Sequence, residues 1–179
     1  MFKIVKDSDK SIRLRCQKVE LPLSEEDKKT LTKMVDYLKK SQDEEYASKH
    51  GIRAGVGLAA PQIGLQKQML AIYYDNGQQI VQYALVNPRI ISSSVKMCYL
   101  QSGEGCLSVD KDVKGYVYRP YKIRVRAYDF LTDQDIEIVA RGYDAIVLQH
   151  EIDHLAGVLY YDHIDKQNPF RILDNSVAI

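Results

Sequence analysis

One segment near the end of the chain organises the sequence: residues 144–156, which read DAIVLQHEIDHLA. Its apolar residues recur at helical spacing, at Ile146, Val147, Ile152 and Leu155. An aspartate in the first turn and a glycine at position 157 are typical of the start and the end of a helix. We therefore predict a core helix over about residues 144–156.

The region upstream of this helix predicts antiparallel β-structure. Apolar runs at 69–74 and 80–86 flank the turn Asp75-Asn76-Gly77, which indicates a hairpin. Four further segments contain residue types that favour strands: 88–91, 95–100, 123–128 and 136–139.

The N-terminal third predicts helical structure. Ser24 precedes Asp27 by three residues, as in a capping box, and apolar residues then recur at Leu31, Met34, Val35 and Leu38. We expect a helix over about residues 25–41. Residues 43–49 read as a short helix or a solvated turn, and their balanced charges favour an exposed segment. No linker or repeat divides residues 1–179, so we expect one α+β domain whose antiparallel sheets pack around the C-terminal helix.

The composition describes an ordinary globular chain of 179 residues, with enough hydrophobic residues (45%) for one core. Because the formal charge is only +1, no overall basic field is expected, and binding to DNA or RNA is disfavoured. The apolar runs are far shorter than the roughly 18 residues of a membrane span, and the N-terminus does not resemble a signal peptide. We therefore expect a cytoplasmic protein with no membrane contact.

The core helix carries the motif His150-Glu151-Ile152-Asp153-His154. The i, i+4 spacing puts both imidazoles on one face, where they can share a metal ion, and the glutamate between them can act on a metal-bound water. The alternative is a pair of histidines that are satisfied by hydrogen bonds in the core.

A catalytic site of this kind needs a third protein ligand. Tyr160 occupies the position of the third histidine in metzincin peptidases, and His163 lies in a polar segment where a surface role is expected. Cys106 is a better candidate, because the surrounding sequence GEGCLS (103–108) lets the backbone approach a metal closely. The other thiols, Cys16 and Cys98, are expected to be buried, and an odd number of cysteines argues against a disulfide framework.

A third element, residues 55–64, reads GVGLAAPQIG and by itself predicts only a tight loop. Taken together and in order, residues 55–64, 104–108 and 150–154 closely resemble the three signature motifs of peptide deformylases. The resemblance extends from about Ser24 to Asp165, and the long segment before Gly55 and the short C-terminus resemble the Gram-positive, type II branch. The segment Asp9-Lys10-Ser11-Ile12-Arg13 departs from the family's usual His-Pro-x-Leu-Arg.

The resemblance implies hydrolysis of the N-terminal formyl group of nascent polypeptides, with release of formate. It implies that Cys106, His150 and His154 hold one divalent metal ion, with Fe(II) as the native metal and zinc, nickel or cobalt in purified protein. A metal-bound hydroxide would attack the formyl carbon with Glu151 as general base and acid. The Gln62 side chain and the Leu107 backbone N–H would stabilise the oxyanion.

Further residues are expected around this centre. The substrate would lie along Val56, Gly57, Gly105, Ile146 and Val147. Glu104 and Asp153 are expected behind the metal ligands, as partners of a histidine ring nitrogen or of a basic residue such as Arg119. The expected partners are formylmethionyl nascent peptides and, transiently, the ribosome, without nucleic-acid specificity, and the expected state is a monomer. Two alternatives to this function remain. One is a structural metal site in which four ligands complete the coordination and no water is bound, and the other is a general endopeptidase with the H-E-x-x-H motif.

Overall fold

The computed structural model describes residues 2–179. Within this range the chain forms three α-helices: α1 (Glu25–Ser41), α2 (Glu44–His50) and α3 (Tyr143–Leu155). The larger sheet has the order β1-β2-β3-β6-β7 and consists of β1 (Gly57–Ala59), β2 (Met69–Asp75), β3 (Ile80–Ser93), β6 (Lys122–Asp129) and β7 (Gln134–Arg141). The smaller sheet has the order β5-β4-β8 and consists of β4 (Met97–Tyr99), β5 (Arg119–Pro120) and β8 (Ser176–Ala178). Short 3-10 turns occur at Lys10–Arg13, Ala60–Ile63 and Tyr160–His163.

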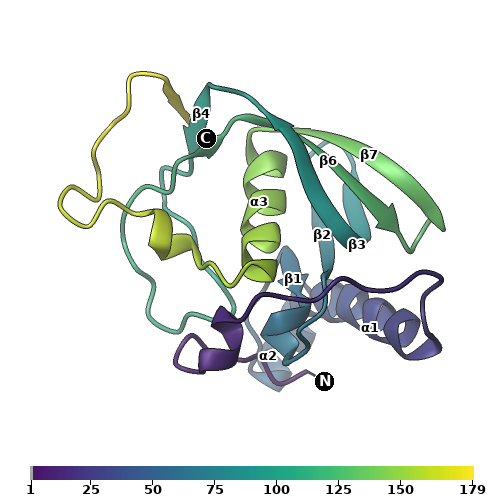
Figure 1. The fold of residues 1–179 in the computed structure, drawn as a ribbon. Helices are drawn as coiled ribbons and strands as arrows, with labels where there is room; N and C mark the ends of the chain where they lie inside the picture. The colour runs from purple at the N-terminus through teal and green to yellow at the C-terminus, as the bar shows by residue number, and fades with distance from the viewer. Residues whose placement is uncertain (1) are drawn as a thin grey trace.

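Helix α3 stands in the middle of the molecule, as Figure 1 shows. It contacts strands of both sheets, including β1 and β7 of the larger one and β5 of the smaller one. The predicted α+β fold around the C-terminal helix is therefore confirmed. Among the described residues, none of the helices has the length and apolar character that crossing a membrane requires.

Strand β2 is buried on both faces, and this explains its continuous apolar run. Leu70 and Ile72 pack in the cluster that contains Val147 of α3, whereas Met69 and Ala71 pack in the cluster that contains α1. Because successive side chains of a strand point to opposite faces, one strand serves two layers.

The predicted hairpin is confirmed, since β2 pairs with β3 from Met69↔Val86 to Asp75↔Ile80. The prediction of a separate strand over 88–91 is wrong, because these residues continue β3. The register of β3 against β6 shifts between Val86 and Arg89 and again between Ile90 and Ser92. Such bulges let one long strand bend without ending.

The helical predictions at the N-terminal end hold. Helix α1 spans Glu25–Ser41, and the Asp27 N–H donates to the Ser24 hydroxyl at 3.1 Å, as an N-cap requires. Helix α2 is formed as a helix and has no buried residue, so the exposure expected for this segment is confirmed.

The end of α3 is fixed by close contact with the N-terminal segment. Gly157 adopts a φ of +75°, and a Cβ at this position would lie 2.2 Å from the Arg13 carbonyl oxygen. Next to it, the Cys16 N–H donates to the Leu155 carbonyl at 2.9 Å. The N-terminal segment can cross here only because residue 157 lacks a side chain.

We predict that Gly157→Ala lowers the free energy of unfolding by at least about 2 kcal/mol, since a steric clash adds to the strain of a positive φ. The matched control is Gly77→Ala, with a φ of +83° and no atom within 4 Å of the new Cβ. It should cost only about 1 kcal/mol, the conformational strain alone. Urea unfolding measures both variants, and equal losses would contradict the proposed clash.

Candidate metal centre

Three side chains with metal-binding atoms converge at the face of α3. Cys106, His150 and His154 offer ligand atoms that all lie within 4.8 Å of one another, and they are the only such group of three or more within residues 2–179. The Cys106 Sγ lies 3.4 Å from the His154 Nε2. A tetrahedral centre with metal–sulfur and metal–nitrogen distances of about 2.3 and 2.1 Å places these ligand atoms about 3.5 Å apart. The donor set fits one metal ion and leaves a fourth position open.

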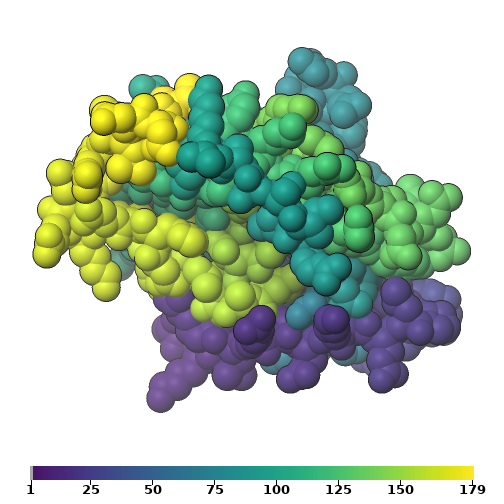
Figure 2. All heavy atoms as spheres, turned by 45° about the horizontal axis from the view of Figure 1, so that its top comes forward, coloured from purple at the N-terminus to yellow at the C-terminus, as the bar shows by residue number. Residues whose placement is uncertain are grey.

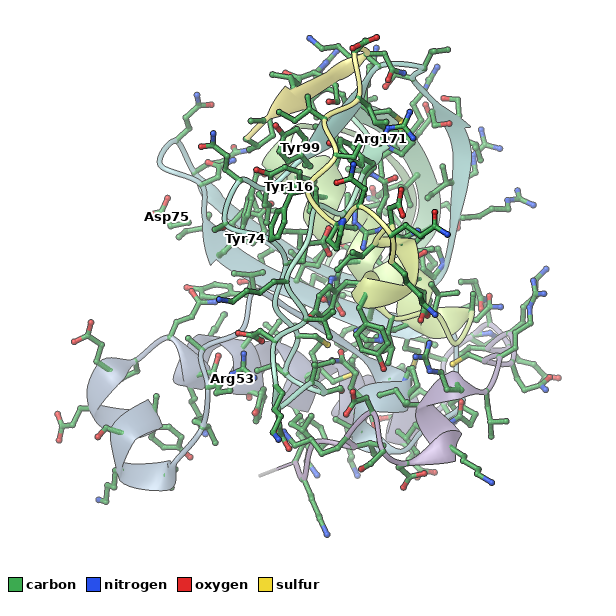
Figure 3. All side chains as sticks on the ribbon, turned by 90° about the vertical axis from the view of Figure 1, so that its left-hand side faces the viewer. Arg53, Tyr74, Asp75, Tyr99, Tyr116 and Arg171 are labelled. Carbon is green, nitrogen blue, oxygen red and sulfur yellow. The ribbon has the colours of Figure 1, made fainter. Side chains whose placement is uncertain are left out.

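The loop that carries Cys106 is held from two sides. The Ser108 N–H and the Gln62 side-chain amide point to the Cys106 sulfur at 3.4 and 3.5 Å. From the other side, the Arg53 guanidinium donates to the carbonyls of Cys106 at 3.3 Å and Val109 at 2.8 Å. Arg53, labelled in Figure 3, was not singled out by the sequence analysis, because an arginine two residues before Gly55 carries no recognisable spacing signal.

A chain of charged side chains lies behind the two histidines. Glu104 Oε2 lies 2.8 Å from His150 Nδ1, and Arg119 donates to Glu104 at 2.6 and 3.0 Å. Arg119 also donates to Asp153 at 2.8 Å, and Asp153 lies 2.7 Å from His163 Nε2. His163 therefore contacts this chain of charges and is not a member of the three-donor group.

The charge balance of this network favours a cation at the metal position. Burial alone raises the pKa of Glu104, but the hydrogen bonds from His150 and Arg119 outweigh it and lower this pKa to about 2. Burial alone lowers the pKa of His150, whereas hydrogen bonds with the Cys106 thiol and Glu104 raise it to about 10. The surroundings of His150 thus stabilise positive charge, which a metal ion supplies in place of a proton.

The second histidine is held in the neutral form. His154 is only 1% exposed, and burial together with the neighbouring His150 lowers its pKa well below the usual value. Neutral imidazole is the form that binds metals. Its Nδ1 is buried without a hydrogen-bond partner among the described residues.

Glu151 lies against the backbone of β1 at Gly57. It is 4% exposed, and its Oε2 is buried with no partner in the described part of the chain. Burial raises its pKa to about 7, although His150 and Arg119 oppose this shift. A Cβ on Gly57 would lie 2.4 Å from Glu151 Oε1, so the glycine makes room for this carboxylate.

Gln62 faces the same space from the 3-10 turn that follows β1. Its Oε1 accepts from the Ala59 N–H at 2.8 Å, which leaves the Nε2 directed to the Ser108 hydroxyl at 3.2 Å and to the Cys106 sulfur. The tight loop predicted for residues 55–64 is in fact a short strand and this turn, because β1 pairs with β2.

A cleft of about 230 Å³ opens in front of the three donors. It is lined by every residue that the sequence analysis assigned to the substrate: Val56, Gly57, Gly105, Ile146 and Val147. Gln62, Leu107, Glu104, Cys106, His150 and Glu151 also line it, as does Gly55 at the start of the 55–64 motif. Four further lining residues were not predicted: Arg53, Ala54, Leu100 and Tyr143. Arg119, Asp153 and His154 lie outside this lining and contact the site from behind.

Comparison with known proteins identifies relatives over nearly the whole chain. The family described as "Polypeptide deformylase" matches residues 1–170. The chain is 48% identical to "Peptide deformylase" of Oceanobacillus iheyensis, over 100% of this chain and 98% of that protein. It is likewise 48% identical to "Peptide deformylase 2" of Bacillus subtilis, over 100% of this chain and 97% of that protein.

Solved structures show the same fold. Peptide deformylase 1B of Arabidopsis thaliana, in complex with an inhibitor, is 30% identical with a TM-score of 0.74, over 92% of this chain and 82% of that one. A probable peptide deformylase of Synechococcus phage S-SSM7 is 31% identical with a TM-score of 0.71, over 92% of this chain and 100% of that one.

The contact between Glu104 and His150 is expected to raise the affinity of the site for a metal ion. In Glu104→Gln, an amide NH₂ faces the Arg119 guanidinium in place of an oxygen, so the acceptor for His150 Nδ1 loses its fixed position. We expect metal affinity to fall by roughly 10–100-fold, measured as metal loss to a chelator. The control is Asp153→Asn, which changes the other partner of Arg119 and leaves the Glu104–His150 bond intact. Equal metal retention in the parent and Glu104→Gln would contradict this role.

Proposed function

This chain belongs to the polypeptide deformylase family, whose general function is metal-dependent deformylation, and we propose that Cys106, His150 and His154 hold its metal. The observation that carries this assignment is the convergence of the three donors at 4.8 Å or less, beside a buried carboxylate with an unpartnered oxygen. The enzyme is a hydrolase that acts on formylated peptides and releases formate.

Glu151 is the proton carrier in this proposal. When bound, the metal ion supplies a water of lowered pKa and polarises the formyl oxygen. The free Glu151 Oε2 accepts a proton from the attacking water and then returns it to the leaving amine. Gly57 keeps this carboxylate in place, because the backbone of β1 packs directly against it.

Two N–H donors face the growing negative charge on the formyl oxygen. Gln62 Nε2 is directed towards the Cys106 sulfur because its Oε1 is bound to the Ala59 N–H. The Leu107 backbone N–H, next to Cys106 in the cleft, is the second donor. Donors that are already oriented cost no rearrangement during the reaction.

The cleft explains a preference for a formyl group followed by methionine. Val56, Ile146 and Val147 form an apolar wall for the methionine side chain, and Ile146 is only 2% exposed. Gly57 and Gly105 leave room for the substrate backbone, which lies extended along residues 55–58. The space beside the metal then takes a formyl hydrogen and excludes the methyl group of an acetylated chain.

The metal is proposed to be Fe(II) in the cell, with zinc, nickel or cobalt in purified protein. The Cys/His/His set supports this range, since a thiolate and two imidazoles suit each of these ions. We further propose that residues 1–179 act as one catalytic domain, as a monomer in the bacterial cytoplasm, in transient contact with ribosomes. The match to bacterial relatives over the full length supports this setting.

The decisive experiment measures formate release from formyl-Met-Ala-Ser by protein purified without oxygen, with metal content determined on each sample. We expect Glu151→Gln to lose at least about a thousandfold in rate while it keeps its metal, because it lacks a proton acceptor. Acetyl-Met-Ala-Ser and casein are controls for general amide hydrolysis. Full activity in metal-replete Glu151→Gln, or cleavage of casein, would contradict the proposal.

Gly57→Ala tests the position of the same carboxylate. The new Cβ displaces Glu151, so we expect a loss of about a hundredfold or more with metal content unchanged. Since both changes act on Glu151 in the chemical step, the kcat of the double variant Gly57→Ala/Glu151→Gln at saturating substrate should be no lower than that of Glu151→Gln alone. Additive losses in the double variant would show that Gly57 acts through another group.

A further inference from the structure

A groove lies on the side of the larger sheet that faces away from α3, where β3 and β6 meet the N-terminal segment. Its volume is about 480 Å³. Four basic side chains line it, Arg15, Lys18, Arg89 and Arg126, and Asp135 is the one acidic residue in its lining. We call these four basic residues and the space between them the basic groove. In Figure 2 the teal atoms of β3 run down to the purple N-terminal segment, with the green atoms of β6 and β7 to their right.

The charges of the basic groove are largely uncompensated. Within residues 2–179, ion pairs involve neither Arg15, Lys18 nor Arg89. Arg126 lies 3.2 Å from Glu137, which it shares with Arg124. The formal charge of +1 for the whole chain therefore conceals a local excess of positive charge.

The register of the sheet brings like charges together. Arg89 of β3 lies directly opposite Arg126 of β6, and Lys122 of β6 lies opposite Arg141 of β7. Like charges at directly opposed positions destabilise a sheet, so an anion that lies between them relieves repulsion. Because alternate residues of β6 face the same side, Lys122 extends the positive charge along the strand beyond the groove, whereas the charge of Arg124 is paired with Glu137.

The walls of the groove are rigid. Asn87, at a φ of +51°, accepts from the Val19 N–H at 2.9 Å and donates to the Val19 carbonyl at 2.8 Å. The Gln17 N–H and carbonyl bond to Gln66 and Gln68 at 2.9 and 2.8 Å. These bonds hold the segment that carries Arg15 and Lys18 against the strand that carries Arg89, so the backbone positions from which the cations project are fixed before any partner binds.

From this charge, register and rigidity we infer that the basic groove binds the phosphodiester backbone of RNA. Arginine and lysine side chains on a fixed backbone suit repeated phosphates, and Tyr128 in the lining adds an aromatic surface. The groove would keep the enzyme near ribosomes, from which formylated chains emerge, a consequence that rests on the proposed function.

The test measures binding of a labelled RNA hairpin to the full chain over a range of KCl concentrations. If the four cations contact phosphates, the logarithm of the binding constant should fall with the logarithm of salt with a slope of about −3. The variant Lys18→Gln/Arg89→Gln should bind about tenfold more weakly at moderate salt and show roughly half this slope.

The matched control is Lys166→Gln/Arg171→Gln, which removes the same charges from the exposed C-terminal segment, on the other side of the molecule in Figures 1 and 3. Binding within about twofold of the parent is expected for it. Equal weakening in both variants, or no binding of RNA by the parent, overturns the inference. Binding of polyglutamate but not of the hairpin would assign the groove to an acidic polypeptide and also overturn it.

Formate release from formyl-Met-Ala-Ser, measured on the same samples, separates this inference from the proposed function. Both variants should keep the parent rate, because their side chains do not line the catalytic cleft. If the Lys18→Gln/Arg89→Gln variant loses RNA binding but keeps formate release, the result supports the role of the groove and leaves the proposed function intact. If the parent binds RNA but releases no formate, only the proposed function is contradicted.

Discussion

The buried Glu104 carboxylate is the interaction on which the rest of the site depends. It lies on the loop that leads to Cys106, accepts from Arg119 of β5 and contacts His150 of α3. One carboxylate thus joins the smaller sheet, the loop of Cys106 and the central helix. A buried carboxylate is stable only when charged or hydrogen-bonding partners surround it. The contacts of Glu104 with Arg119 and His150 therefore fix these three elements relative to one another, and they also orient the His150 ring.

Close backbone approach is the second constraint, and it acts where glycine removes a side chain. Gly57 brings β1 against Glu151, and Gly157 brings the N-terminal segment against the end of α3. In both places the helix that carries the proposed metal ligands is packed against backbone. The Glu151 carboxylate is therefore confined to one position, as its proposed role in proton transfer requires.

The parts of the fold that were predicted correctly are those with local signals. Helices α1 and α3 carry apolar periodicity with end signals, and the β2–β3 hairpin has its turn in sequence. The short strands β1, β5 and β8 were missed, because each is two or three residues long and forms only by pairing with a distant partner. The length of β3 was misjudged, since its bulges interrupt the sequence pattern without ending the pairing.

The sequence by itself determined the chemistry available to this protein: two imidazoles on one helical face, because a period of 3.6 residues places positions i and i+4 together, and a carboxylate next to the first of them in sequence. Only the tertiary structure decided what stands against that face. Cys106 reaches His154 from 48 residues away, and Arg53 holds its loop. The tertiary structure also gathered Arg15, Lys18 and Arg89 into one groove, although the net charge indicated no basic surface. Contacts between distant segments depend on packing and strand register, which leave no local signal in the sequence.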